Sequence, residues 1–443
     1  MTLNWTGTAS RSGLASGSKP DALEQEFRED RPLITEIDCV ALDDQDPLAG
    51  EAAKYHLPEG VLYFAGNSLG ALPFAAQQRV AEIIRDEWGE KLVGGWNSAG
   101  WYSSPARVGA KIAQLIGANA DEVTVTDSTS VNLFKSIIAA MGLSTHRKVC
   151  LTDREIFPTD LYIMQGIEKL LRDRFTLKAV RRNSILDEID DDMGLLVLSH
   201  VDYRSGDVFD MQSITRRVHE AGGLVLWDLC HSAGIFDIRL NEVQADFAVG
   251  CGYKFLNGGP GAPSFVYVAK RHHENITQPL TGWMGHANPF EFDESYQSAT
   301  GIRRMLCGTP SVVAMGCLEA AIDELLPVSI QAIQEKSRKL TRLFIELMKQ
   351  RCGNFGFTLI SSENDAIRGS QISYTHEHGD ALMRALIARN VIGDFRAPDC
   401  VRFGVSPLYL SYMDIWQAVE VIKMVMETEV WRDYLGLKKE PVT

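Results

Sequence analysis

The sequence predicts an α/β fold built on a mostly parallel β-sheet. Between residues 61 and 310, short apolar runs alternate with segments of helical periodicity, which is the pattern of repeated strand–helix–strand units. Polar residues of chemical interest follow the ends of these runs, where parallel sheets bind their ligands. From Ser311 onward, two amphipathic helices (about 311–325 and 329–351) precede shorter alternating strands and helices, which indicates a second, smaller α/β domain.

Changes in composition along the chain predict four segments. Residues 1–25 are rich in Ser, Gly, Thr and Ala, and we expect a loose N-terminal arm there. Residues 26–60 are expected to pack with the small domain, and their first part is charged and predicts a short helix. The large domain is expected at 61–310 and the small C-terminal domain at 311–443.

The overall composition narrows the classes of partner. The chain has 443 residues, of which 45% are hydrophobic and 23% charged, as in an ordinary globular protein. The net charge of -14 argues against nucleic acid, because binding to phosphates needs a basic surface. No secretory leader and no run of about 18 apolar residues is found, so we expect no membrane partner. Eight cysteines without a C-x-x-C pair suit a reducing cytoplasm, the localisation that we predict.

The stretch from Leu224 to Pro263 carries the most chemical information. It reads as a buried strand that ends in Asp228, a turn with His231, and a second apolar run that leads to Lys254 in a glycine-rich loop. A loop lysine amine can hold the aldehyde of pyridoxal phosphate (PLP) covalently, and a carboxylate can keep its pyridine nitrogen protonated. We therefore predict PLP as the cofactor, with Lys254, Asp228 and the adjacent Tyr253 as catalytic residues.

The same stretch resembles the kynureninase family of PLP-dependent enzymes. WDLCHSAG is similar to that family's WDLAHSAG, and GCGYKFLNGGPGAP is similar to its cofactor-lysine segment. Further matches follow in order from about Tyr63 to Tyr409: GNSLG at 66–70, F-P-T-D at 157–160 and R-F-G-x-x-P-L-Y at 402–409. The resemblance implies the fold type I architecture of PLP-dependent transferases, with a large and a small domain.

The resemblance also implies a reaction. Kynureninases break the Cβ–Cγ bond of L-kynurenine or 3-hydroxykynurenine by hydrolysis, which yields anthranilate or 3-hydroxyanthranilate and L-alanine. This reaction belongs to tryptophan catabolism, in the kynurenine pathway that also leads to NAD. The expected partner of the chain is therefore a small amino-acid substrate.

The family's cofactor positions can be carried over residue by residue. A helix beginning near Ser128 offers free N–H groups for a phosphate, although the hydroxyls there also suit simple N-capping. Phe157 matches a ring that stacks on the pyridine, and Thr309 matches a residue that reaches the phosphate in a neighbouring subunit, which implies a homodimer. The full cofactor set implied by the resemblance is Thr129, Ser130, Phe157, Pro158, Thr159, Asp160, Ser199, Asp228, His231, Tyr253, Lys254, Trp283 and Thr309.

Substrate residues follow from chemistry and from the same resemblance. Arg402 is the candidate for the substrate carboxylate, because a guanidinium holds a carboxylate through paired hydrogen bonds. Asn67 and Ser68 lie in the turn that the family places beside the substrate, and Trp96 is the candidate for the aryl site. We predict no metal: the adjacent His272 and His273 are interpreted as a solvated surface pair.

Three alternatives remain open on the sequence. The chain can be another fold type I enzyme, an aminotransferase or a cysteine desulfurase, although no cysteine lies in an obvious mobile loop. It can be a catalytically silent PLP-fold binding protein, but such a scaffold has no chemical need for both Lys254 and Asp228. A nucleotide-binding protein is the third, and neither of the glycine signatures for nucleotides is found.

Overall fold

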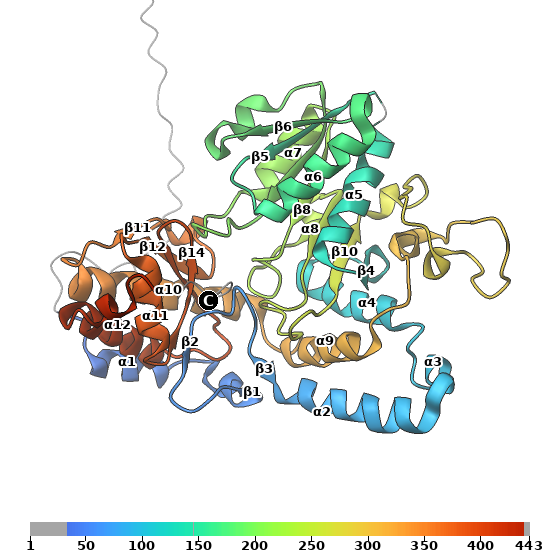
Figure 1. Cartoon of the computed structure of the whole chain (residues 1–443). Coiled ribbons are helices and arrows are strands. Elements are labelled where there is room, and N and C mark those ends of the chain that lie inside the picture. The colour runs from blue at the N-terminus through green and yellow to red at the C-terminus, as the bar shows by residue number, and fades with distance from the viewer. Residues whose placement is uncertain (1–32, 145, 438–443) are drawn as a thin grey trace, which may run out of the picture.

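The computed structural model describes residues 33–144 and 146–437, so the expected arm at 1–25 and the helix expected after it lie outside the described residues. The large domain contains a seven-stranded sheet in the order β4-β10-β9-β8-β7-β5-β6 (Figure 1). Four of its strand pairs are parallel, and only β10 runs antiparallel to its two neighbours. This confirms the expected α/β fold. The strands are β4 Val123–Thr126, β5 Val149–Asp153, β6 Thr176–Val180, β7 Met193–Ser199, β8 Leu224–Asp228, β9 Phe247–Gly250 and β10 Ser264–Val268.

Helices cover both faces of this sheet. Along β7, Leu195 and Val197 pack into one core with α5 and α6, whereas Leu196 and Leu198 pack into the other core with α4 and α7. This alternation explains why the strands read as continuous apolar runs, because both of their faces are buried. The helices of this part are α2 Phe74–Glu82, α3 Gly95–Ser98, α4 Ser104–Ile116, α5 Thr129–Leu143, α6 Pro158–Leu171, α7 Met211–Glu220, α8 Leu240–Val243 and α9 Val312–Leu325.

The small domain is an antiparallel sheet in the order β11-β12-β15-β14 with helices packed against it. Its last α-helix begins with a capping box, in which Ser411 and Asp414 satisfy each other's backbone N–H groups. The elements are α10 Ile330–Cys352, β11 Thr358–Leu359, β12 Gln371–Thr375, α11 Gly379–Ile387, β13 Val391–Ile392, β14 Asp394–Arg396, β15 Cys400–Gly404 and α12 Tyr412–Glu427.

The N-terminal segment lies against this small domain. Helix α1 (Glu36–Asp43) lies beside α12 (Figure 1). The Asp43 carboxylate accepts hydrogen bonds from the backbone N–H groups of Tyr412 (2.7 Å) and Met413 (3.0 Å), so it caps α12. Short pairs follow as β1 Tyr55–His56 with β3 Leu72–Pro73, and β2 Leu62–Tyr63 with β13. The run at 61–65 is therefore a two-residue strand of the small domain, and we propose that the large domain begins after it.

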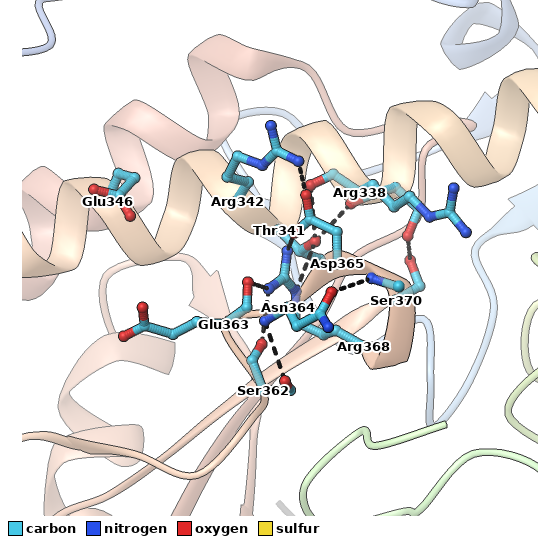
Figure 2. A network of polar contacts seen from close by, with 12 residues as sticks. Arg338, Thr341, Arg342, Glu346, Ser362, Glu363, Asn364, Asp365, Arg368 and Ser370 are labelled. Atoms are coloured by element: carbon cyan, nitrogen blue, oxygen red, sulfur yellow. Dashed lines mark hydrogen bonds and ion pairs between the residues drawn. The ribbon is translucent and has the colours of Figure 1, made fainter. Parts of the chain in front are cut away.

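A buried guanidinium holds one loop of the small domain (Figure 2). Arg368 is 2% exposed, and its Nε donates to Thr341 Oγ1 of α10 (3.2 Å). Its Nη1 donates to the carbonyl of Ser362 (2.7 Å), and its Nη2 pairs with Asp365, which also binds Arg342. The segment 362–370 is thereby fixed on the surface of α10.

The slightly longer segment 361–371 in turn holds a loop of the large domain. The loop at 203–208, which follows β7, accepts hydrogen bonds from the segment 361–371. Gln371 Nε2 donates to the Tyr203 carbonyl (3.1 Å), and Ser361 Oγ donates to a loop carbonyl (2.5 Å). The two domains are therefore tied together beside the carboxyl end of β7.

The prediction of a solvated histidine pair is wrong. His273 is buried and its Nε2 lies 2.9 Å from the carbonyl oxygen of Val268. His272 stacks on Phe247 and its Nε2 lies 2.8 Å from Asp246 Oδ1. A tight turn after β10 folds both rings back onto the sheet, where buried backbone and carboxylate groups satisfy them. Among the residues that the structure describes, no group of acidic, histidine and cysteine side chains has the arrangement of a metal site, and no helix is long and apolar enough to cross a membrane.

Candidate active site

The carboxyl ends of β7, β8 and β9 bring the central candidates together. Ser199 and Asp228 are register partners at the ends of neighbouring strands, and Ser199 Oγ lies 3.3 Å from Asp228 Oδ2. The other carboxylate oxygen of Asp228 accepts the backbone N–H of Cys230 (2.8 Å). Asp228 is thus buried with both oxygens satisfied, in the position that the sequence predicted for a carboxylate facing a ligand.

Lys254 reaches this place from the loop after β9. Its Nζ lies 2.9 Å from His231 Nε2 and 5.8 Å from the centre of the Phe157 ring. Burial lowers the pKa of His231 well below its usual range, and the positive charge of Lys254 lowers it further. His231 is therefore neutral, and its Nε2 accepts a hydrogen bond from the lysine amine.

A second carboxyl group lies beside Asp228. Asp160, in the first turn of α6, is buried, and its side chain is hydrogen-bonded to Asp228. Burial raises the pKa of Asp160 well above its usual range, and the negative charge of Asp228 adds to this effect. The Asp160 carboxyl is therefore easier to protonate than that of an ordinary aspartate. Its side chain is not a helix cap, since residue 157 occupies the capping position without a side-chain bond.

The N-terminus of α5 opens near the same edge of the sheet. Ser128 is the N-cap and accepts the backbone N–H of Val131 (3.4 Å), so this one hydroxyl does the capping. Thr129 Oγ1 lies 3.1 Å from Ser264 Oγ, and Ser130 is half-buried. The remaining N–H groups of the first turn and the helix dipole are available to an anion.

The turn at 66–70 packs directly on the lysine loop. The backbone N–H of Gly70 donates to the carbonyl of Tyr253 (2.8 Å). A Cβ at residue 70 would lie 2.8 Å from Asn257 Cα and closer still to the carbonyl oxygen of Lys254. Only glycine therefore fits where the two loops meet.

A cluster of charged groups of the small domain lies against the 66–70 turn. The Asp394 carboxylate binds Arg402 through Nε (2.7 Å) and Nη2 (2.5 Å). Ser68 Oγ donates to Asp394 (2.5 Å), and the Arg396 Nη2 lies 3.2 Å from both of these groups. Burial raises the pKa of Asp394, but the charge and hydrogen bonds of Arg402 outweigh this and hold the pKa below its usual range. The predicted Arg402 and Ser68 are thus brought together.

Asn67 lies at the base of this cluster. Its Nδ2 donates to Gln371 Oε1 (3.1 Å), and its Oδ1 is buried without a partner. A Cβ on Gly404 would lie 2.9 Å from Asn67 Cβ and still closer to the amide oxygen. The glycine of the R-F-G sequence therefore makes room for the asparagine of the 66–70 turn.

The remaining candidates form a separate aromatic cluster. Trp283 Nε1 donates to Thr309 Oγ1 (3.2 Å), and the Trp283 ring packs edge-on against Trp96 at a centroid distance of 5.9 Å. Tyr102 and Phe290 complete the cluster. The structure therefore brings Trp96, Trp283 and Thr309 together, but it places them with one another and not with Lys254.

Sequence reasoning missed three residues of the site: Tyr203, Asp394 and Arg396. The Tyr203 carbonyl accepts a hydrogen bond from Arg402 Nη1, and its ring packs edge-on against Phe157 at 5.3 Å. The sequence DFRAPDCVRF does contain a signal for the other two, since two short alternating runs flank a turn and predict a hairpin. Its register sets Asp394 opposite Arg402.

The described residues fit a PLP group. A primary amine on Lys254, the Asp228 carboxylate and the free first turn of α5 provide what the aldehyde, the pyridine nitrogen and the phosphate require. Two buried polar atoms around the amine, His231 Nδ1 and Asp160 Oδ2, have no hydrogen-bond partner in the protein. Unpartnered buried polar atoms are rare in folded proteins, so these two indicate a polar ligand.

Comparisons with known proteins decide the family. A model of the kynureninase C-terminal domain matches residues 333–422. A kynureninase from Burkholderia mallei (strain SAVP1) is 45% identical over 405 residues, covering 90% of this chain and 97% of its own length. A kynureninase from Pseudomonas fluorescens is 43% identical over 404 residues with the same coverage. The chain belongs to the kynureninase family.

Solved structures agree on the fold. The apo cysteine desulfurase from Thermococcus onnurineus NA1 superposes with a TM-score of 0.73, covering 86% of this chain and 98% of its own, at 16% identity. The cysteine desulfurase CsdA from Escherichia coli gives 0.72 at 17% identity, with the same coverage. At this identity the likeness shows the fold alone, which is fold type I as predicted. Kynureninase membership confirms PLP as the cofactor and makes the chain a PLP-dependent hydrolase of carbon–carbon bonds.

Proposed function

We propose that the chain hydrolyses the Cβ–Cγ bond of L-kynurenine, of 3-hydroxykynurenine or of both. The single observation that carries this proposal is its 45% identity to a kynureninase over 90% of the chain. One water is consumed in the reaction. Its hydroxyl ends on the carbonyl carbon that leaves as anthranilate or 3-hydroxyanthranilate, and a proton ends on Cβ of the L-alanine product.

Within this proposal, Lys254 binds PLP covalently and afterwards moves the proton at the substrate Cα. The bound cofactor supplies an electron sink for the carbanion that forms at that carbon. Asp228 holds the proton of the pyridine nitrogen, and Ser199 and the neighbouring Asp160 fix that carboxylate in place. The neutral His231 accepts from the lysine amine and orients it.

The cofactor's remaining contacts are assigned by the same proposal. The first turn of α5, with Thr129 and Ser130, binds the phosphate, and Tyr253 assists there and relays a proton. The exposed ring of Phe157 covers one face of the pyridine; Pro158 and Thr159 shape the turn that presents it. This arrangement is supported by the grouping of these residues around Lys254 at one edge of the sheet.

The substrate is positioned by the small domain and the 66–70 turn. Arg402 orients the carboxylate, which selects the bond at Cα that aligns with the cofactor ring. Asn67 and Ser68 line the same side. Trp96, which packs on Trp283 in the separate aromatic cluster, is proposed for the aryl group of the substrate in the neighbouring subunit. The support is the cluster that joins Ser68 to Arg402 within 2.9 Å.

Product analysis tests the reaction directly. The purified protein is loaded with PLP and given L-kynurenine, and anthranilate and L-alanine are measured together. Equal amounts of the two products are expected. A keto acid formed only in the presence of an amino-group acceptor would instead support the aminotransferase alternative, and sulfide or sulfur released from cysteine would support the desulfurase.

The proposal includes a homodimer in which Thr309 and Trp283 serve the neighbour's cofactor phosphate. Their position in a cluster apart from Lys254 supports this, as do several large apolar side chains that are exposed nearby on the single chain. The most exposed of these are Trp88, Leu92, Val93, Phe290 and Phe292, at 61%, 63%, 81%, 66% and 85% of their surface. A second subunit would bury them.

Mixing two inactive variants tests this exchange between subunits. Lys254→Ala and Trp283→Ala are unfolded and refolded together, so that half of the dimers are mixed. If Trp283 acts across the interface, each mixed dimer has one intact site, and about a quarter of the parental activity returns. No return of activity, with mixed dimers present, would place Trp283 in its own subunit's site.

Cytoplasmic localisation is part of the proposal as well. All eight cysteines are free thiols, most of them buried. Free buried thiols are typical of proteins in a reducing compartment.

A further inference from the structure

The substrate pocket of the proposed function contains two guanidinium groups and one carboxylate, which meet at Ser68 of the 66–70 turn. Arg396 lies on β14 and Arg402 on β15, the two strands of one hairpin. Asp394 is the register partner of Arg402, and Arg396 follows two positions later on β14. The Nη2 atoms of both arginines approach Ser68 Oγ, at 3.2 and 2.9 Å. Two positive charges against one negative charge leave this pocket with a net positive charge.

The hydrogen bonds show how that charge is shared. Arg402 is 2% exposed and its Nε and Nη2 are both occupied by Asp394, while its Nη1 donates to the carbonyl of Tyr203. This carboxylate neutralises Arg402 in the paired geometry that a substrate carboxylate would otherwise use. One N–H on Nη1 remains for a substrate carboxylate, so Arg402 supplies a single hydrogen bond and paired recognition needs a second group.

Arg396 is placed differently. Its side chain keeps about a third of its surface, and its contact with Asp394 is one bond of 3.2 Å instead of a paired one. The proximity of a like charge costs free energy in the free protein: burial lowers the pKa of Arg396, and Arg402 lowers it further. Asp394 Oδ2 lies between the two guanidiniums and offsets part of this repulsion, and a further anion at the exposed side of Arg396 would offset the rest.

The same charges reach the reacting end of the site. Both arginines lower the pKa of the buried His231, which lies 2.9 Å from the Lys254 amine. Both also act on the Tyr203 hydroxyl, whose ring packs against Phe157. Contacts also connect this cluster to the lysine: Arg402 donates to the Tyr203 carbonyl, the Tyr203 ring packs on Phe157, and the Phe157 ring lies 5.8 Å from Lys254 Nζ.

From this geometry we propose that Arg396 is a second binding residue for the substrate carboxylate and supplies the uncompensated positive charge of the pocket. Arg402, held by Asp394 and Tyr203, forms the rigid wall against which the carboxylate is oriented. The inference deepens the proposed function, since it names the group that recognises the α-carboxylate of the amino acid. It also applies to any amino-acid ligand of the site.

The test compares two ligands that differ only in charge. L-Alanine and L-alaninamide are titrated by calorimetry into the PLP-loaded parent protein, Arg396→Gln, Arg396→Lys and a control, Arg432→Gln. Arg432 is an exposed arginine paired with Glu429. We expect the dissociation constant of L-alanine to rise at least tenfold in Arg396→Gln and less in Arg396→Lys. That of L-alaninamide should stay within about twofold in all of them.

Several outcomes would overturn the inference. If Arg396→Gln binds L-alanine as tightly as the parent does, Arg402 alone holds the carboxylate. If both ligands weaken equally, the substitution acts on the structure and not on carboxylate recognition. Circular dichroism and the absorbance of bound PLP show whether Arg396→Gln is misfolded. If it is, the ratio of the dissociation constants of L-alanine and L-alaninamide in Arg396→Lys decides instead.

The result is independent of the reaction. A parent protein that releases no anthranilate from L-kynurenine, yet discriminates alanine from alaninamide through Arg396, would contradict the proposed function and keep this inference. A protein that releases anthranilate, but whose ratio of alanine to alaninamide affinity does not change in Arg396→Gln, would support the proposed function and contradict this inference.

Discussion

Replacing Gly70 with alanine is expected to lower the rate of anthranilate formation by about 10- to 100-fold. The new Cβ would lie 2.8 Å from Asn257 Cα, which is 0.6 Å short of the 3.4 Å at which ordinary contact begins, and the carbonyl of Lys254 is closer still. Backbone atoms cannot rotate away, so the 66–70 turn and the lysine loop must separate by at least this distance. Displacements approaching 1 Å cost about 100-fold in well-oriented reactions.

The matched control is Gly166→Ala. Gly166 lies inside α6, and a Cβ there meets no atom within 4 Å. This variant should keep full activity and gain up to about 1 kcal/mol of stability, because alanine favours the helix. Initial rates are followed by anthranilate fluorescence, and bound PLP by its absorbance. A Gly70→Ala protein with parental kcat and KM would refute the claim that the two loops meet at the catalytic lysine.

Three further predictions concern buried contacts. Asp246 is buried, but hydrogen bonds from its two histidine partners hold its pKa below the usual range, so its contribution to stability is present above the unfolded pKa of about 4 and is lost as pH falls. In thermal melts, Asp246→Asn should lose less stability on acidification than the parent and should cost about 1–3 kcal/mol at pH 7. An acid profile equal to that of the parent would contradict this prediction. Asp365→Ala leaves the buried Arg368 guanidinium without its carboxylate partner (Figure 2). Urea unfolding should show that the free energy of unfolding falls by about 3–5 kcal/mol. A decrease below about 1 kcal/mol would mean that the ion pair is dispensable. In Gly404→Ala, the new Cβ would press against the Asn67 side chain. We expect a higher KM for kynurenine and a free energy of unfolding lower by about 1–3 kcal/mol. A KM equal to that of the parent would show that Asn67 does not shape the substrate pocket.

The large domain and the cofactor end of the site were accessible from the sequence. Apolar runs mark strands buried on both faces, and a parallel sheet collects the residues after such strands at one edge. Asp228, Ser199 and Lys254 meet there because their strands are neighbours with matching registers. Local pattern was sufficient, since Ser199 and Asp228 end their own strands and Lys254 lies in the loop directly after β9.

The substrate end of the site could be predicted only in part, because it is built from residues that are distant in the sequence. Ser68, Tyr203 and Arg402 come from three separate segments, and only tertiary packing joins them. The sequence indicated Arg402 but not that Asp394 already neutralises it. The run at 61–65 also read as a long strand of the large domain, whereas it pairs for two residues with β13 of the small domain. A pairing partner more than 300 residues away leaves no local signal.

The most direct test of the central claim is anthranilate formation by the Lys254→Ala protein loaded with PLP and given L-kynurenine. Lys270→Ala serves as the control, because Lys270 is an exposed lysine paired with Asp121. The account predicts anthranilate from the parent and from Lys270→Ala, and none above background from Lys254→Ala with its fold intact. Turnover by Lys254→Ala at a rate near that of the parent would contradict the assignment of this lysine as the catalytic residue.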